Sequence, residues 1–379
     1  MLFTAPPLDE REVAVLDEID ELKKQLRYSL VEPRRWSGSL RKLSLARAIQ
    51  GSNSIEGYEA ELDDAAAIAL GEEPLDAAEE TRLALEGYRD AMTYVLQLAG
   101  DDFFSYSDQL VRSLHFMMTK HDLKAGRGLW RPGQIFVHDE RTGTIVHEGP
   151  EADRVPGLMD ELIGSLRGAP EDPPLIQAAM AHLNLVMIHP FRDGNGRMAR
   201  CLQSLVLARS RILAPQFMSV EEYLGANTPA YYAVLAEVGG GSWQPARDVR
   251  PWIRFMLVAH RRQAATLLRR VRESEQLWLA LEDLAGRRML PPRSVNALFD
   301  AAIGLRIRNA TYRAIFEEPG EAITDATASR DLKAMVDSGL LVPHGAKRGR
   351  FYSASPELVA VRGEVVGRRD ARDDSDPFA

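Results

Sequence analysis

Apolar residues recur every three or four positions along most of this 379-residue chain, which is the pattern of helices that bury one face. Residues 8–26 give the clearest example, because Val13, Leu16 and Ile19 begin an apolar stripe that continues to Leu26. The chain is therefore predicted to be mainly α. The same pattern predicts further helices over residues 40–49, 77–98, 173–188, 197–210 and 252–272.

One segment departs from the helical pattern. In residues 134–147, the runs Ile135-Phe136-Val137 and Thr144-Ile145-Val146 flank the turn-forming residues 139–143. We expect a β-hairpin here.

The last part of the chain has a third pattern. A helix is predicted from Thr324, a strand after Ser338, and a basic turn over residues 345–350 that leads back into Phe351. Helix, turn, helix and basic hairpin are the elements of a winged helix. The predicted parts are a helical N-terminal region, a core with the hairpin, a linker helix with the winged-helix domain, and a disordered tail, over residues 1–105, 106–262, 263–365 and 366–379.

Winged helices bind DNA or protein, and the sequence leaves both partners open. Arg330 and Lys333 lie one turn apart on the predicted recognition helix, and the wing carries Lys347, Arg348 and Arg350. The same helix also carries three aspartates. With 47 basic and 55 acidic residues, the formal charge of −8 gives no general support for nucleic-acid binding.

Three features favour a cytoplasmic protein without a membrane segment. Cys201 is the only cysteine, which excludes an intramolecular disulfide. The first residues reach acidic side chains before any long apolar run, unlike a signal peptide. No segment approaches the roughly 20 apolar residues that a membrane helix needs.

The segment His189-Pro-Phe-Arg-Asp-Gly-Asn-Gly-Arg-Met-Ala-Arg200 combines several groups that phosphoryl chemistry needs. A histidine can take a proton from an attacking hydroxyl, and the carboxylate of Asp193 can hold Mg²⁺. Gly194-Asn195-Gly196 can turn tightly and direct backbone N–H groups at an anion where a helix begins. Arg197 and Arg200 are neighbours on that helix and can bind phosphate oxygens.

This segment resembles the signature of the Fic family, H-x-F-x-(D/E)-G-N-(G/K)-R-x-x-R, at every fixed position. The resemblance implies a helical core that binds ATP and Mg²⁺ and transfers AMP to a Ser, Thr or Tyr hydroxyl of a target protein, with pyrophosphate leaving. In that scheme His189 is the general base and Asp193 is the Mg²⁺ ligand. The implied phosphate contacts are Asn195 with Gly194 and Gly196 for the α- and β-phosphates, Arg197 for the β- or γ-phosphate, and Arg200 for the γ-phosphate. Glycine at position 196 favours AMP transfer over phosphate transfer.

A second segment near the N-terminus resembles the inhibitory motif of the family, (S/T)-x-x-x-E-(G/N), with Ser52, Glu56 and Gly57 at the matching positions. The resemblance implies that Glu56 pairs with Arg200 and removes it from the γ-phosphate. A charge-assisted hydrogen bond contributes about 1.5–3 kcal/mol, so one such pair could suppress activity about 10- to 100-fold.

Two further roles come from the resemblance. The predicted hairpin, with Ile135, Phe136 and Val137, is similar to the flap that pairs with the backbone of the target. Tyr232 is similar to a tyrosine that packs on the adenine.

Alternative functions stay open at this point. They are transfer of another nucleotide or of phosphocholine, removal of AMP from a target, and transcription regulation by a nucleotide-sensing core. The sequence also leaves open the target, self-modification and homo-oligomerisation.

Overall fold

The computed structural model describes residues 1–31, 35–122, 126–138, 142–168, 172–210, 219–316, 322–369 and 375–379. The chain forms two compact units. The first contains residues 1–25, 44–265 and 375–379, and the second contains residues 26–43 and 266–374. The predicted boundaries differ from these units, because the chain passes from one unit to the other within three helices. These helices are α1 (Glu10–Val31), α2 (Ser37–Ser54) and α11 (Arg250–Arg287).

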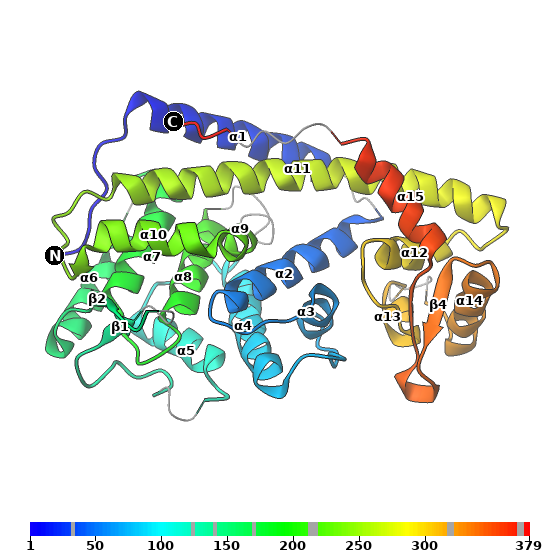
Figure 1. The fold of residues 1–379 in the computed structure, drawn as a ribbon, viewed down its shortest axis with the longest axis horizontal. Coiled ribbons are helices and arrows are strands. Elements are labelled where there is room, and N and C mark those ends of the chain that lie inside the picture. The colour runs from blue at the N-terminus through cyan, green and yellow to red at the C-terminus, as the bar shows by residue number, and fades with distance from the viewer. Residues whose placement is uncertain are drawn as a thin grey trace. The chain divides into compact units, whose positions relative to one another are not determined.

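The first unit is mainly helical, as the apolar periodicity predicted. Its centre is α7 (Pro174–Ile188), which packs against α6 (Val155–Arg167) and α8 (Asn195–Arg209) (Figure 1). Because α7 is apolar on nearly all sides, almost every one of its residues is buried. The other helices of this unit are α3 (Leu62–Ala69), α4 (Glu79–Leu98), α5 (Asp108–Met118), η1 (Ala152–Arg154), α6 (Val155–Arg167), α8 (Asn195–Arg209), α9 (Glu221–Ala226) and α10 (Thr228–Gly239).

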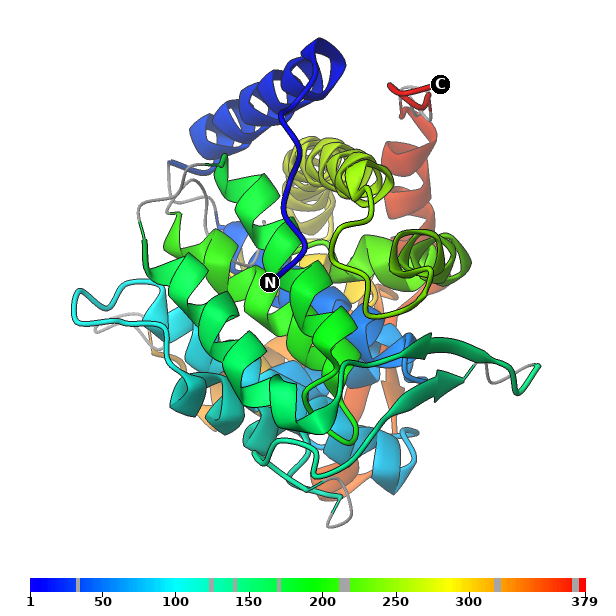
Figure 2. The same cartoon turned by 90° about the vertical axis from the view of Figure 1, so that its left-hand side faces the viewer.

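The predicted hairpin consists of β1 (Phe136–His138) and β2 (Ile145–Glu148), which pair antiparallel with Val137 opposite His147. Figure 2 shows this hairpin, in teal, extending from the helices. Residues 139–141 of its predicted turn, which spans residues 139–143, lie outside the described residues. The sequence did not predict a third strand, β3 (Gly241–Ser242), which pairs parallel to β2.

The second unit contains the element order that the sequence predicted for its last part. The predicted recognition helix is α14 (Asp325–Asp337), which carries the buried Asp331. Arg293 binds this carboxylate with two hydrogen bonds, from Nε at 2.6 Å and from Nη2 at 2.9 Å, and so holds the helix in place. Thr324 caps the start of this helix by accepting from the N–H of Thr327. The elements of the second unit are α12 (Ser294–Ala302), α13 (Asn309–Ala314), α14 (Asp325–Asp337), β4 (Leu341–His344), η3 (Lys347–Gly349), β5 (Phe351–Ala354) and α15 (Pro356–Gly367).

The described end of the chain differs from the predicted disordered tail. Helix α15 reaches Gly367, and the guanidinium of Arg11 donates to the carbonyls of Pro377 and Ala379 at 2.8 and 2.9 Å. The ring of Phe378 also faces two cations, which supplies a physical reason for the order. Residues 370–374 of the tail lie outside the description. Within the described residues, no helix is long and apolar enough to cross a membrane.

Candidate active site between two central helices

The loop that joins α7 to α8 is held in a costly backbone conformation. His189 ends α7 in the left-handed region with a φ of 52°, and Gly194 precedes α8 in the same region with a φ of 74°. A residue with a Cβ rarely adopts this conformation unless its surroundings hold it. The side chain of Asn195 provides part of the support, because it accepts from the N–H of Phe191 at 2.9 Å and donates to its carbonyl at 3.0 Å.

The ring of His189 is held as one tautomer. Its Nδ1 lies 3.1 Å from the carbonyl of Val186, which can only accept, so Nδ1 carries the proton. The lone pair is therefore on Nε2. Burial lowers the pKa of His189 to about 4 against the opposing effect of the Val186 bond, so the ring is neutral at pH 7. A neutral, half-buried imidazole with a lone pair on Nε2 can act as a general base.

His115 on α5 supports the same loop and was not singled out from the sequence. Its ring stacks on Phe191 with the centroids 3.6 Å apart. Its Nε2 donates to the carbonyl of Asp193 and its Nδ1 accepts from the N–H of Gly128, both at 2.9 Å. These bonds require the neutral Nε2–H tautomer, and burial lowers the pKa of His115 to about 4.

Arg197 and Arg200 place two guanidinium groups at the start of α8. Each residue is 1% exposed, although charged side chains are almost never fully buried without partners. Among the described residues, the buried atoms Nε and Nη1 of Arg197 and Nη1 of Arg200 have no hydrogen-bond partner. The first turn of α8 adds backbone N–H groups that lack intrahelical acceptors. This arrangement is suited to an anion.

Glu56 supplies a carboxylate at this position. Its Oε1 lies 2.6 Å from Nη2 of Arg200, and a Cβ built on Gly196 would overlap the same oxygen. Burial opposes ionisation, but Arg200 and Arg197 outweigh it and lower the pKa of Glu56. The carboxylate is therefore ionised at neutral pH. It lies above the first turn of α8, where an incoming anion would bind.

The end of α2 carries Glu56 to this place. Ser52 contacts Arg200 twice, because its hydroxyl accepts from Nε and its carbonyl from Nη2, both at 2.8 Å. Gly57 has a φ of 82° and donates its N–H to the carbonyl of Ser54. This left-handed glycine ends the helix and turns the chain away from α8.

Asp193 lies at the mouth of the site. Its side chain is 53% exposed, and Oδ2 is 3.4 Å from Nη2 of Arg197. Within the described ranges, no group of three or more His, Cys, Asp or Glu residues could hold a metal ion. Asp193 would therefore be a single carboxylate ligand. Mg²⁺ commonly takes one or two protein carboxylates and completes its shell with water and substrate phosphates, so the site suits it.

The side chains of two residues predicted to contact the nucleotide already have hydrogen-bond partners within the chain. The side-chain amide of Asn195 is engaged by Phe191 and would have to release both bonds to reach a phosphate. The hydroxyl of Tyr232 donates to the carbonyl of Ile55 at 3.1 Å, next to Glu56, while its ring remains 49% exposed. Among the flap residues, Phe136 is exposed and Ile135 and Val137 are half-buried.

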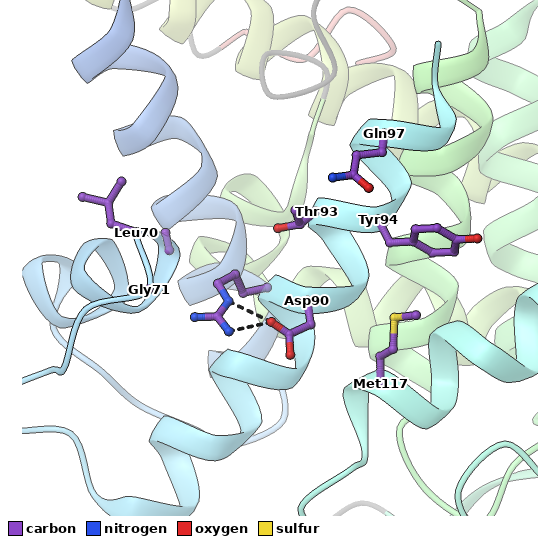
Figure 3. Close-up of a pocket in the computed structure, with 9 residues that line it drawn as sticks. Leu70, Gly71, Asp90, Thr93, Tyr94, Gln97 and Met117 are labelled. Atoms are coloured by element: carbon purple, nitrogen blue, oxygen red, sulfur yellow. Dashed lines mark hydrogen bonds and ion pairs between the residues drawn. The ribbon is translucent and has the colours of Figure 1, made fainter. Parts of the chain in front are cut away.

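A described groove lies away from this site. It has a volume of about 650 Å³ and is lined by residues of α4 and neighbouring segments, among them Leu70, Asp90, Tyr94 and Met117 (Figure 3). Asp90 is paired with Arg89 and Lys120. None of the predicted site residues lines this groove.

The residues predicted to contact DNA lie in the second unit. Arg330 and Lys333 are exposed on α14, and Lys347 and Arg350 are exposed between the strands of the hairpin. Lys333 is paired with Asp337 at 2.5 Å. The side chain of Arg348 lies outside the description.

Comparisons with known proteins point to one family. The family model of the Fic/DOC family matches residues 105–207, which contain α7, the loop and most of α8. A protein named protein adenylyltransferase Fic from Nematostella vectensis is 28% identical over 67% of this chain and 59% of its own length. A protein adenylyltransferase fic-1 from Caenorhabditis briggsae is 37% identical over 34% of this chain and 22% of its own length. The chain thus spans less than two thirds of these relatives.

Solved structures show the same fold. A Fic family protein from Desulfovibrio desulfuricans has a TM-score of 0.59 at 22% identity and covers 93% of this chain and 99% of its own. A fragment of Fic-1 from C. elegans has a TM-score of 0.50 at 22% identity and covers 68% of this chain and 71% of its own. Together with the intact motif, the family match identifies residues 105–207 of the chain as a domain of the Fic/DOC family.

Proposed function

We propose that this chain is a protein adenylyltransferase that moves AMP from ATP to a Ser, Thr or Tyr hydroxyl of a target protein and releases pyrophosphate. The observation that carries the proposal is the neutral imidazole of His189 together with the buried guanidinium groups of Arg197 and Arg200, all three of which act on the carboxylate of Glu56. The names of the relatives support the same reaction.

His189 acts as the general base. As the target hydroxyl attacks the α-phosphorus, Nε2 takes its proton, and the bond from the α-phosphorus to the bridging oxygen of pyrophosphate breaks. The carbonyl of Val186 holds Nδ1–H and so keeps Nε2 available for the proton. The backbone N–H groups at the start of α8 and the two arginines bind the triphosphate. Asp193 would hold Mg²⁺, which, when bound, neutralises phosphate charge.

Glu56 restrains this reaction. Because its carboxylate is paired with Arg200, the triphosphate has to compete with it for the same cation. A charge-assisted hydrogen bond of this kind contributes about 1.5–3 kcal/mol, which corresponds to about 10- to 100-fold in activity. The target docks on the flap, where β1 offers an edge strand and the exposed Phe136.

DNA binding is not part of the proposed function. Lys333 is engaged by Asp337, and Asp325 is also exposed on α14, which weakens the positive field of this helix. Arg330, Lys347 and Arg350 would remain as phosphate contacts. If the protein retained labelled duplex DNA and the variant Arg330→Ala did not, DNA would be a further partner of this chain.

The proposal is tested with ATP labelled at the α-phosphate, Mg²⁺ and a host lysate. Wild type, Glu56→Gly, and Glu56→Gly with His189→Ala are compared, and Glu59→Gly controls for a glycine placed nearby at an exposed glutamate. We expect strong protein labelling by Glu56→Gly, weak labelling by wild type and Glu59→Gly, and none by the double variant. Silence from Glu56→Gly despite measured ATP binding would sink adenylyl transfer.

A further inference from the structure

The flap hairpin and the base are joined by hydrogen bonds at the end of α7. The last carbonyls of a helix have no intrahelical partner and need donors from elsewhere. Here Nε2 of His147, on β2, donates to the carbonyl of Met187 at 2.8 Å. The backbone N–H of Arg131, just before the hairpin, donates to the carbonyl of Pro190 at 2.8 Å. Both sides of the flap therefore reach the residues that flank His189.

Arg131 makes the most direct of these connections. Its Nε donates to the carbonyl of His189 at 2.9 Å, and its Nη1 donates to the carbonyl of Gly133 at 2.6 Å. Its Nη2 donates to the carbonyl of Pro150. Gly133 precedes β1 and Pro150 follows β2, so one guanidinium links both ends of the hairpin to the backbone of the base.

The surroundings of Arg131 show that packing alone does not explain why an arginine is buried here. The residue is 3% exposed, its described side-chain partners are all main-chain carbonyls, and burial lowers its pKa. Burying a cation without a counter-ion is costly, and an apolar side chain of similar length would fill the same space at lower cost. What an apolar side chain would not provide is three simultaneous donors in a fixed plane.

We propose that Arg131 is a positioning residue that couples the target-docking flap to the catalytic base, so that the register of the flap sets the orientation of His189. This inference rests on the proposed function. A target strand that pairs with β1 would move the ends of the hairpin, and Arg131 would carry that movement to the carbonyl of His189. His189 is held in the left-handed region, and the bond from Arg131 to its carbonyl is one of the contacts that hold it there, so a shift of Arg131 would turn the ring.

The test compares Arg131→Met with Arg131→Lys in the Glu56→Gly background. The lysine keeps the charge but loses the planar set of donors, whereas methionine loses both. Arg154→Met is the matched control, because Arg154 is exposed and follows the flap in the chain. Three quantities are measured: kcat/KM for the target, the Kd for ATP, and the pH at which kcat/KM falls on the acidic side.

We expect kcat/KM for the target to fall about 100-fold in Arg131→Met and by less in Arg131→Lys, since a misplacement of about 1 Å can cost that much. The Kd for ATP should stay within about twofold. Of the groups that act electrostatically on His189, Glu56 raises its pKa and His147 lowers it, and the Arg131 cation also lowers it. Loss of that charge should move the acidic limb to higher pH in Arg131→Met, while Arg131→Lys should leave it in place.

Two results would overturn the inference. One is an acidic limb in Arg131→Met that coincides with that of the parent. The other is an Arg131→Met variant whose ATP affinity and melting temperature fall in proportion to its kcat/KM, because a residue with only a structural role would behave in this way. If the Glu56→Gly parent itself does not transfer AMP, the ring signal of His189 in ¹³C-labelled protein is titrated by NMR. A raised pKa of His189 in Arg131→Met then supports the coupling although the transfer reaction has failed. An unchanged pKa of His189 contradicts the coupling as well as the transfer reaction.

Discussion

The hydroxyl of Tyr232 lies at the junction between the candidate nucleotide site and the segment that we propose to be inhibitory. It donates to the carbonyl of Ile55, one residue before Glu56, at 3.1 Å. A phenylalanine at this position would keep the ring but lose that bond. The hydrogen bond and the ring can therefore be separated by experiment.

We expect Tyr232→Phe to release part of the restraint. Removing one neutral hydrogen bond costs about 1 kcal/mol, so basal AMP transfer should rise about fivefold while the Kd for ATP stays the same. Tyr94→Phe, at an exposed tyrosine of α4, is the control and should change neither quantity. A fall in ATP affinity without a rise in basal activity would mean that the hydroxyl serves the nucleotide instead.

At the scale of elements, the restraint that we propose for Glu56 depends on how the chain turns after α2. Gly57 has a φ of 82°, and a Cβ built there would meet no atom within 4 Å. A side chain at this position is therefore disfavoured by the backbone conformation alone, which costs about 1 kcal/mol. Relief of that strain would shift Glu56, the preceding residue, away from Arg200.

We expect Gly57→Ala to raise basal activity and to lower the melting temperature by a few degrees. The matched control is Gly38→Ala on the same helix, where a Cβ also meets nothing but φ is not positive. That change should leave activity unaltered and keep or raise stability, because alanine favours helix. Equal behaviour of the two variants in a thermal melt and a labelling assay would contradict the argument.

Helices and strands that have a periodic pattern of apolar residues could be predicted from the sequence. Contacts between segments that are distant in the chain could not. The helix pair around His189 and the hairpin follow from spacing, and the motif residues are contiguous in the chain. His115, Arg131 and His147 act through main-chain carbonyls, which have no signature in the amino-acid sequence. The strand β3 is Gly241–Ser242, which is too short to show a period.

At the scale of the whole molecule, the buried neutral histidines link stability to pH. Burial lowers the pKa of His115 to about 4 and that of His182 to about 3, and both side chains are fully buried. The unfolded chain binds these protons below about pH 6.5, whereas the folded chain binds them only near pH 4 or below. The stabilisation is therefore complete above pH 6.5 and is lost progressively as the pH falls toward 4.

We expect the free energy of unfolding to fall by about 2 kcal/mol for each of these histidines between pH 7 and pH 5. Urea unfolding at the two pH values measures the difference. His115→Gln should reduce the pH dependence, whereas the control His344→Gln, at an exposed histidine of β4, should leave it unchanged. A free energy of unfolding that is equal at pH 7 and pH 5 would contradict the burial of neutral imidazoles.

Because Gly196 has no Cβ, it constrains which residues related sequences can carry at positions 56 and 196. The carboxylate of Glu56 fills the space that a Cβ at position 196 would occupy, so the two positions share one volume. A variant that carries any larger residue at 196 has to displace Glu56, and a chain that lacks the glutamate is released from this requirement. Among related sequences, residue 196 and residue 56 should therefore vary together, so that the loss of one relaxes selection on the other.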